Sequence, residues 1–170
     1  MSRPREADII ECIPHLRRYA RGLMRDRMHA DDLVQDTLER VWDRFGSWRE
    51  GGSLRSWAFG IMYHLFLDHI RRRKTRPEEL AGDDLPEIPD RPTQTDRLEM
   101  RDIQRALSRL PDEYRSVLLL IAVEEMSYKE AASVLDVPIG TVMSRLSRAR
   151  ERLRSELKGI AVSEKIHRVK

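Results

Sequence analysis

The side chains best suited to binding chemistry lie on a predicted basic helix near the end of the chain. Its apolar positions recur at spacings of four, three and four residues, as a helix requires; they are Val142, Leu146, Ala149 and Leu153. The other faces carry hydroxyl and guanidinium groups, namely Ser144, Arg145, Ser147, Arg148, Arg150 and Arg152. Arginine can donate two hydrogen bonds to a guanine edge, and serine can contact phosphate. This helix is therefore a candidate for reading duplex DNA.

A short preceding helix must hold the basic helix in place. Ser127 and Glu130 have the spacing of a capping box, in which hydroxyl and carboxylate each satisfy a backbone N–H at a helix start. Pro138 then interrupts that helix, because it pushes Val137 out of the α region. A small apolar helix, a short turn and a basic helix are together typical of a helix-turn-helix that enters the major groove. The alternative is an ordinary surface helix with solvated arginines.

Composition limits the function classes without selecting one. The chain has 170 residues, of which 40% are hydrophobic, enough for one or two small domains. Its net charge of +3 is too small to indicate nucleic acid by itself. The single cysteine, Cys12, excludes an internal disulfide and fits a reducing compartment. No apolar run approaches the roughly 20 residues that span a bilayer, and the N-terminus lacks a secretory signal. We expect a cytoplasmic protein without membrane insertion.

Helical periodicity dominates both halves of the chain and predicts an all-α fold of two small helical domains. Three apolar stripes mark the helices of the first domain, over Ile9 to Leu23, Leu33 to Phe45 and Leu54 to His69, with breaks at Arg25 to His29 and Gly46 to Ser53. Prolines mixed with acidic residues predict a flexible linker before a second, four-helix domain. The expected boundaries are 1–75 for the first domain, 76–95 for the linker, 96–160 for the second domain and 161–170 for a tail.

A second group of cations, Arg71 to Lys74, ends the third predicted helix. Cations there interact well with the helix dipole, which would be a purely structural role. Alternatively they follow the phosphates of an unstacked single strand, because aromatic side chains precede them. Those side chains are Trp48, Trp57, Phe59, Tyr63 and Phe66. We expect burial for Trp57 and Phe66, and exposure for Trp48 in its glycine-rich loop.

Catalysis and cofactor binding are not indicated. His64 and Asp68 could share a metal, but no third ligand converges on them, so a hydrogen bond on the helix surface is the better interpretation. The sequence has no nucleophile motif, no phosphate-binding glycine loop and no convincing acid/base pair. We expect a protein that is not an enzyme and that holds neither cofactor nor metal.

Three motifs between about Pro14 and Leu157 resemble those of bacterial sigma factors of the extracytoplasmic-function (ECF) group. The segment Asp31 to Thr37, DDLVQDT, is similar to the one that engages the clamp coiled coil of RNA polymerase. The segment Ser53 to Ile61, SLRSWAFGI, followed by Asp68 and Arg71-Arg72, is similar to the family's promoter-melting helix. Similarity to its C-terminal helix-turn-helix domain rests on Leu110-Pro111, Tyr114-Arg115 and Gly140 to Arg145.

The resemblance implies a division of labour between three surfaces. Core RNA polymerase would be bound through Asp32, Leu33, Gln35, Asp36 and Glu39. The opened minus-ten strand of promoter DNA would be held by Trp48, Arg55, Trp57, His64, Arg71 and Arg72. The minus-thirty-five duplex would be contacted by Arg115, Lys129, Thr141, Met143, Ser144, Arg145, Ser147 and Arg148. An anti-sigma factor would hold the free protein inactive, and no homo-oligomer would be needed.

Two departures from the family pattern concern promoter choice. His64 stands where the family often has Asn, and Met143 where Lys or Arg is common, so the preferred promoter should differ accordingly. Two rival functions remain. A stand-alone helix-turn-helix regulator would not need the acidic segment Asp31 to Asp43 and would need a dimerising helix, which the sequence does not offer. An adaptor that binds an anti-sigma factor without touching DNA would not need the basic helix.

Overall fold

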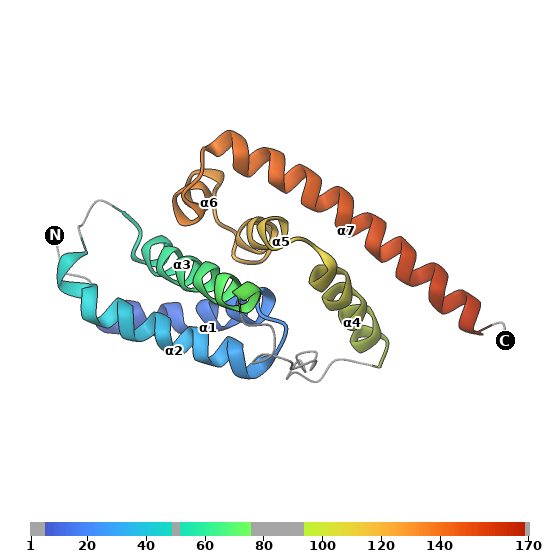
Figure 1. The fold of residues 1–170 in the computed structure, drawn as a ribbon, viewed down its shortest axis with the longest axis horizontal. Helices are drawn as coiled ribbons and strands as arrows, with labels where there is room; N and C mark the ends of the chain where they lie inside the picture. The colour runs from blue at the N-terminus through green and yellow to red at the C-terminus, as the bar shows by residue number, and fades with distance from the viewer. Residues whose placement is uncertain (1–5, 49–51, 76–93, 169–170) are drawn as a thin grey trace.

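The computed structural model describes residues 6–48, 52–75 and 94–168, with side chains over 7–48, 52–75 and 100–160. These residues form helices and no strand, so the predicted all-α fold is confirmed (Figure 1). The N-terminal half contains α1 (Glu6–Leu23), α2 (Arg27–Arg44), the short 3₁₀ helix η1 (Phe45–Ser47) and α3 (Leu54–Thr75). The C-terminal half contains α4 (Gln94–Arg109), α5 (Asp112–Leu118), the π-helical turn η3 (Leu119–Val123), α6 (Tyr128–Leu135) and α7 (Ile139–Arg168).

The first three helices pack against one another through the predicted apolar stripes. The break between α1 and α2 is shorter than the predicted Arg25 to His29, because Asp26 caps α2 by accepting a hydrogen bond from the backbone N–H of His29 at 2.8 Å. Met28 and His29 are therefore helical. Thr37 is buried in the apolar stripe of α2, and its hydroxyl is satisfied because it donates a hydrogen bond to the carbonyl of Leu33 at 2.6 Å.

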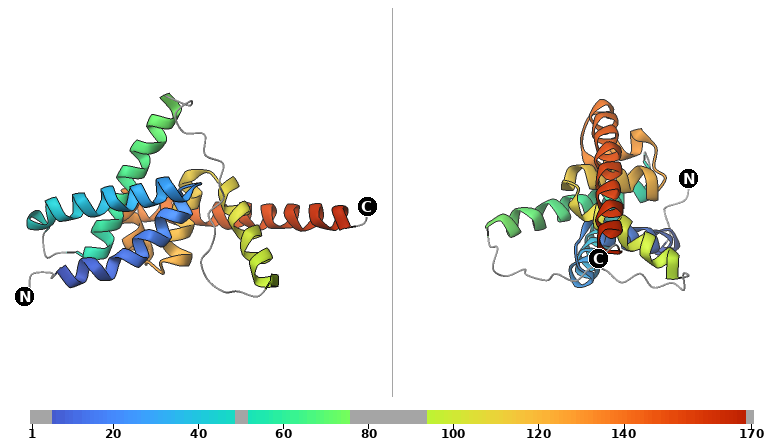
Figure 2. Two further views of the ribbon diagram at one scale, coloured as in Figure 1. Left: turned by 90° about the horizontal axis from the view of Figure 1, so that it is seen from below. Right: turned by 90° about the vertical axis from the view of Figure 1, so that its right-hand side faces the viewer.

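The helix-turn-helix forms as the sequence predicts. Ser127 and Glu130 make both hydrogen bonds of a capping box at the start of α6. That helix ends at Leu135, and the next residue, Asp136, has a φ of 52° that turns the chain before α7 begins at Ile139. The far end of α7 extends beyond the other helices (Figure 2).

Two predicted boundaries change. Gln94 and Thr95, expected in the linker, belong to α4, and the rest of the linker, 76–93, lies outside the described residues. The expected tail is helical up to Arg168, because α7 continues through it.

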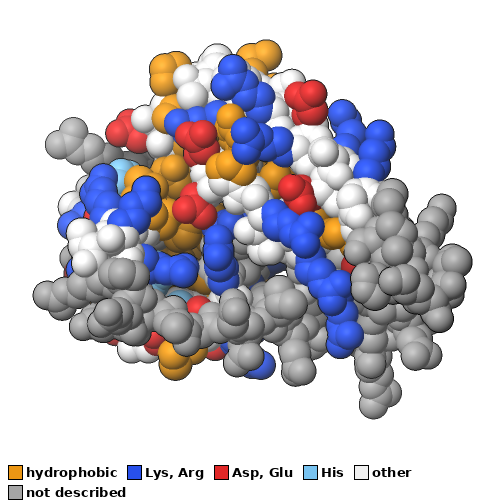
Figure 3. Space-filling view, turned by 45° about the vertical axis from the view of Figure 1, so that its right-hand side comes forward, with side chains coloured by type: hydrophobic (Ala, Val, Ile, Leu, Met, Phe, Trp, Pro, Cys, Tyr) orange, Lys and Arg blue, Asp and Glu red, His pale blue; other side chains and the backbone are white. Residues whose placement is uncertain are grey.

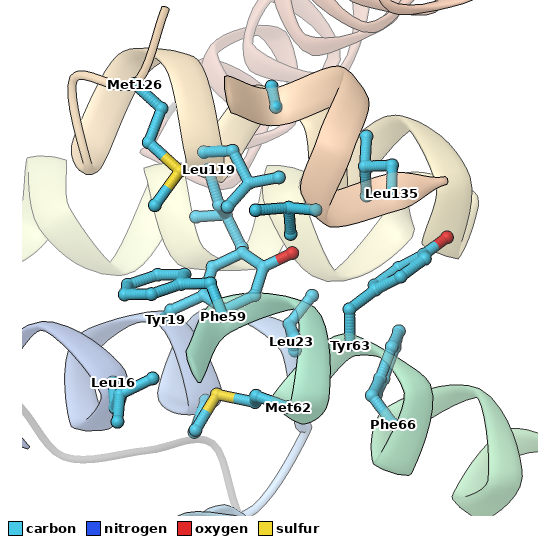
Figure 4. Packing of buried hydrophobic residues seen from close by; sticks show 14 of the residues in the cluster. Leu16, Tyr19, Leu23, Phe59, Met62, Tyr63, Phe66, Leu119, Met126 and Leu135 are labelled. Atoms are coloured by element: carbon cyan, nitrogen blue, oxygen red, sulfur yellow. The ribbon is translucent and has the colours of Figure 1, made fainter. Parts of the chain in front are cut away.

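The two halves share one hydrophobic core. Tyr19 of α1 and Phe59 of α3 lie against Leu119 and Met126 of the C-terminal half (Figure 4). Helix α3 also packs against α6, and α1 packs against α5 and η3. The sequence predicts two domains but does not predict this contact. In the described arrangement they form a single closed body.

Gly22 allows the closest approach between the halves. A Cβ atom built at this residue would lie 2.6 Å from Cδ1 of Leu119. Any larger residue would push against a buried leucine, so the absence of a side chain at Gly22 lets α1 reach η3. Gly60 of α3 faces α6 more loosely, because its nearest neighbour, the carbonyl oxygen of Val134, would lie 4.0 Å from an added Cβ.

Candidate nucleic-acid interface

The outer face of α7 presents most of the residues predicted to contact the minus-thirty-five duplex. Val142, Leu146 and Ala149 are buried, so the intervening polar positions face outward. Met143, Ser144, Ser147 and Arg148 of α7 are exposed, Thr141 is half-buried, and Lys129 is exposed on α6. Met143 and Ser147 also line a shallow hollow of about 320 Å³ with Tyr128, Leu146, Arg150 and Arg154. The surface is available without any rearrangement of the protein.

Two arginines assigned to that interface have partners within the protein. Arg145 is half-buried, and its Nη2 lies 3.4 Å from the carboxylate of Glu113. Arg115 is only 3% exposed. It donates to the carbonyl of Leu23 at 2.8 Å and to the Asp112 carboxylate at 2.5 Å, so it joins α5 to the end of α1. Burial lowers the pKa of Arg115 from its ordinary value, and Asp112 opposes this effect.

The residues assigned to the minus-ten strand lie along α3 and in the turn before it. Arg71 and Arg72 are exposed at the basic end of α3. His64 is exposed, and its Nδ1 lies 2.7 Å from the carbonyl oxygen of Gly60. Trp57 packs at the margin of the core and Trp48 is half-buried, which makes Trp48 less exposed than predicted. Phe66 is buried, as predicted.

Arg55, at the start of α3, is turned toward the C-terminal half. Its Nη2 donates to the backbone carbonyl of Glu124 at 2.7 Å and to the Glu124 carboxylate at 2.9 Å. Its guanidinium also lies over the ring of Phe59, 5.6 Å from the ring centre. This predicted DNA-binding side chain is therefore already engaged within the protein.

Glu124 is the centre of a polar cluster that sequence reasoning missed. Its side chain is 0% exposed, yet both oxygens have cationic or imidazole partners from the N-terminal half. Arg18 Nε donates to Oε1 at 2.7 Å, and His15 Nδ1 lies 2.9 Å from Oε2. Burial would raise the pKa of Glu124, but the hydrogen bonds from Arg18, His15 and Arg55 outweigh it and lower the pKa below its ordinary value. The only sequence signal is a glutamate directly after the apolar run Val117 to Val123.

The predicted polymerase-binding residues lie together on α2. Asp32, Gln35, Asp36 and Glu39 are exposed on the side away from the core, and Gln35 donates to Glu39 at 3.1 Å. Leu33 is buried, so it can support this surface only from beneath. No described helix contacts α2 extensively from the C-terminal half. The acidic face is thus available in the closed body.

Charged side chains of both signs lie on the described surface, and the described residues offer neither a grouped metal site nor a membrane-spanning helix. Figure 3 shows Lys and Arg side chains spread over one face, with single acidic side chains between them. Among the side chains described, no three His, Cys, Asp or Glu residues are grouped as a metal site would require. None of the described helices is long and apolar enough to cross a membrane.

Two stretches of the chain match known family models. Residues 100–153 match sigma-70 region 4, and residues 9–63 match the sigma2 domain of PhyR. These stretches contain the helix-turn-helix and most of the three-helix N-terminal unit. The C-terminal half therefore matches a DNA-binding region of sigma-70 transcription factors, and the N-terminal half matches a sigma2 domain.

Relatives narrow the class further. The chain is 36% identical to the ECF RNA polymerase sigma factor EcfG of Rhodopseudomonas palustris, over 86% of this chain and 81% of that protein. This chain belongs to the family of ECF RNA polymerase sigma factors.

Two solved structures share the fold. The sigma factor RpoE of Bartonella quintana, in complex with the anti-sigma factor NepR, is similar with a TM-score of 0.77 and 33% identity over 90% of this chain and 96% of that one. The anti-anti-sigma factor PhyR of the same organism, complexed with NepR, has a TM-score of 0.59 and 19% identity over 88% of this chain and 49% of that one. The second likeness concerns the fold alone.

Proposed function

We propose that this ECF sigma factor acts in the cytoplasm, where it brings core RNA polymerase to promoters through three surfaces. The acidic face of α2 binds polymerase, the outer face of α7 contacts the minus-thirty-five duplex, and α3 with its preceding turn holds the minus-ten strand. The observation that carries the proposal is the face of α7, where Met143, Ser144 and Ser147 lie exposed while the intervening apolar residues are buried. A DNA-reading helix needs this division of sides.

The described closed body corresponds, in this proposal, to the protein held out of transcription. Arg55 is paired with Glu124, and α6 packs on α3, so part of the strand-binding helix is covered. Opening DNA costs a few kcal/mol per unstacked step, and phosphate and base contacts must offset that cost. Covering those contacts therefore suppresses strand capture. Separation of the two halves would restore them.

An anti-sigma factor is the partner proposed to stabilise the closed body. The similar sigma factor RpoE was solved with one bound, and the similarity extends over both halves of this chain. A partner that contacts both halves at once would favour the closed arrangement by its difference in affinity for the two states. Its binding would then exclude polymerase-dependent strand opening.

A second function is favoured by one observation. Residues 9–63 match the sigma2 domain of PhyR, whose relative in Bartonella quintana is an anti-anti-sigma factor. A protein of that kind would bind an anti-sigma factor without reading DNA. The exposed hydroxyl and arginine face of α7 argues against it, because protein mimicry alone does not require Ser147 and Arg148 at the surface.

Run-off transcription with purified core polymerase separates the two functions. The template pool carries a random library upstream of a fixed transcribed region, so no promoter needs to be known in advance. A sigma factor should enrich a minus-ten and a minus-thirty-five sequence among the transcribed templates, whereas core polymerase alone should not. A folded protein that enriches no sequence would contradict the proposal, and if it also fails to bind core polymerase the result would favour the adaptor.

A further inference from the structure

The Glu124 cluster contains more positive groups than one carboxylate needs. Arg18 and Arg55 both pair with Glu124, and His15 adds a third partner. The side chains of these partners are 40% exposed for His15, 52% for Arg18 and 32% for Arg55, while that of Glu124 is fully covered. The partners belong to α1 and α3, and the carboxylate comes from the other half of the chain. Removing Glu124 by opening the body would leave a concentrated basic site on the N-terminal half.

The geometry of that site suits a phosphate group. Two guanidinium groups converge on neighbouring oxygens, and planar arginine forks match carboxylate and phosphate alike. Nε of Arg55 is buried without a hydrogen-bond partner among the described residues. A carboxylate has two oxygens, whereas a phosphodiester has four: two non-bridging oxygens that share one negative charge, and two bridging oxygens. A phosphodiester could therefore also satisfy the donor that Glu124 leaves unpaired.

The backbone on both sides of Glu124 has an unusual conformation, which directs the carboxylate toward the cationic side chains of the N-terminal half. The N–H of Glu124 bonds to the carbonyl of Leu119, five residues back, in the π-helical turn η3. Glu125 then has a φ of 53°, a left-handed conformation that is uncommon for a glutamate. Single π turns and non-glycine residues at positive φ are both concentrated at functional sites. Burial of a carboxylate among cations is weak evidence for stability alone, because desolvation opposes the attraction.

We propose that His15, Arg18 and Arg55 form a phosphate-binding site for the backbone of the opened promoter strand, and that Glu124 occupies this site in the closed body. The two occupants exclude each other. Closing the body therefore removes a strand contact, and strand binding removes an interaction that holds the body closed. The inference rests on the proposed function, because a sigma factor on an open promoter is what supplies the single strand.

The first experiment measures closure in the free protein by small-angle X-ray scattering. Glu124→Gln keeps the shape of the side chain and removes its charge, and Glu125→Gln is the matched control at an exposed neighbouring residue. We expect Glu124→Gln to raise the opened fraction at least about fivefold, the lower end of typical coupling between sites. The control should scatter like the wild type. Equal scattering of all three proteins would overturn the role of Glu124.

The second experiment measures strand binding in assembled holoenzyme. The probe is a fork-junction DNA with a single-stranded minus-ten element, whose sequence the wild-type holoenzyme enriches from a random library. Arg18→Ala should weaken binding and lower the salt slope by about 0.7, the value for one single-strand phosphate contact. Arg18→Lys should restore much of both, and Arg17→Ala, an exposed neighbour, should change neither.

The outcomes separate the site from the proposed function. If wild-type holoenzyme forms but enriches no promoter sequence, the proposed function fails. If it enriches a sequence and Arg18→Ala binds the fork with wild-type affinity and salt slope, the phosphate site is wrong and the cluster is only a contact between halves. A phosphate site selective for nucleic acid also predicts that 10 mM inorganic phosphate, added at constant ionic strength, leaves closure of the free protein unchanged. Opening by inorganic phosphate alone would overturn the assignment to a DNA strand.

Discussion

The two predicted DNA-binding surfaces differ in whether the protein itself covers them. On α7, Met143, Ser144 and Arg148 are exposed in the closed body. On α3, Arg55 is tied to Glu124, and α6 packs against the helix. The difference indicates that the surface proposed to read duplex DNA is preformed, whereas the surface proposed to hold the single strand depends on the separation of the two halves. Neither surface was predicted with any information on the other half of the chain, so their accessibility is a property of tertiary packing.

The largest expected effect concerns the surface that would bring polymerase to either DNA site. Asp36→Arg changes the charge by two units on the exposed side of α2 and should abolish stable binding to core polymerase. Glu11→Arg makes the same charge change at an exposed position of α1 and serves as the control. A binding titration at physiological salt, with helicity checked by circular dichroism, measures both. Wild-type affinity of a folded Asp36→Arg protein would refute the assignment of α2.

The preformed surface is tested by substitutions in α7. Arg148→Ala should weaken binding to an isolated minus-thirty-five duplex by about 1–3 kcal/mol if the guanidinium reads a guanine, or lower only the salt slope if it contacts phosphate. Arg145→Ala should have the smaller effect, because Glu113 competes for its guanidinium. Fluorescence anisotropy over a range of salt concentrations distinguishes these results. Equal affinity and equal salt dependence for wild type and both variants would remove α7 from the interface.

Closure itself can be altered at two glycines. In both helices a Gly-to-Ala change gains up to about 1 kcal/mol of helix propensity. Gly60→Ala should keep that gain, since its Cβ meets nothing closer than 4.0 Å. Gly22→Ala should instead lower the free energy of unfolding by about 1–3 kcal/mol, because its Cβ would lie 2.6 Å from Cδ1 of Leu119 and overlap it. Urea unfolding of the two variants should therefore shift in opposite directions, and equal shifts would mean that α1 and η3 do not pack closely in solution.

The smallest effect on stability and the narrowest effect on function are expected at His64. Its side chain is exposed and contacts only the Gly60 carbonyl among the hydrogen bonds described. His64→Asn exchanges one donor and acceptor pair for another, so it should change the preferred base at one minus-ten position and leave unfolding unchanged. Transcription from a library randomised over the minus-ten element measures the preference. An unaltered preference at every position would make His64 a helix-surface residue without a role in recognition.

Local signals predicted most of the fold. The capping box at Ser127 and Glu130, the interruption at Pro138 and the apolar stripes of α1, α2 and α3 all depend on residues within a few positions of one another. Such patterns can be read from the sequence, because helix starts, stops and faces are set by nearby residues. The same reasoning identified the exposed face of α7.

The contact between the halves could not be predicted in this way. Glu124 is 109 residues from His15, 106 from Arg18 and 69 from Arg55. Arg115 is 92 residues from the Leu23 carbonyl that it contacts. No local pattern relates such distant residues, and a single arginine in a DNA-binding motif looks the same whether it faces solvent or the other domain. For this reason the sequence predicted Arg55 and Arg115 as DNA-binding residues and gave no sign of their partners.

The free protein is closed, and we expect it to open when it binds core polymerase. Energy transfer between two fluorescent labels tests this change most directly. Fluorophores on Asp43→Cys of α2 and Ser155→Cys of α7, both exposed, report the distance between the halves. Cys12 is the single native cysteine. It is buried, and burial raises its pKa, so it reacts slowly with thiol labels. Replacing it with Ala leaves only the two introduced thiols for labelling. Efficient transfer in the free protein should fall when core polymerase is added and should already be lower with Glu124→Gln. Unchanged transfer in a holoenzyme that transcribes would contradict the account.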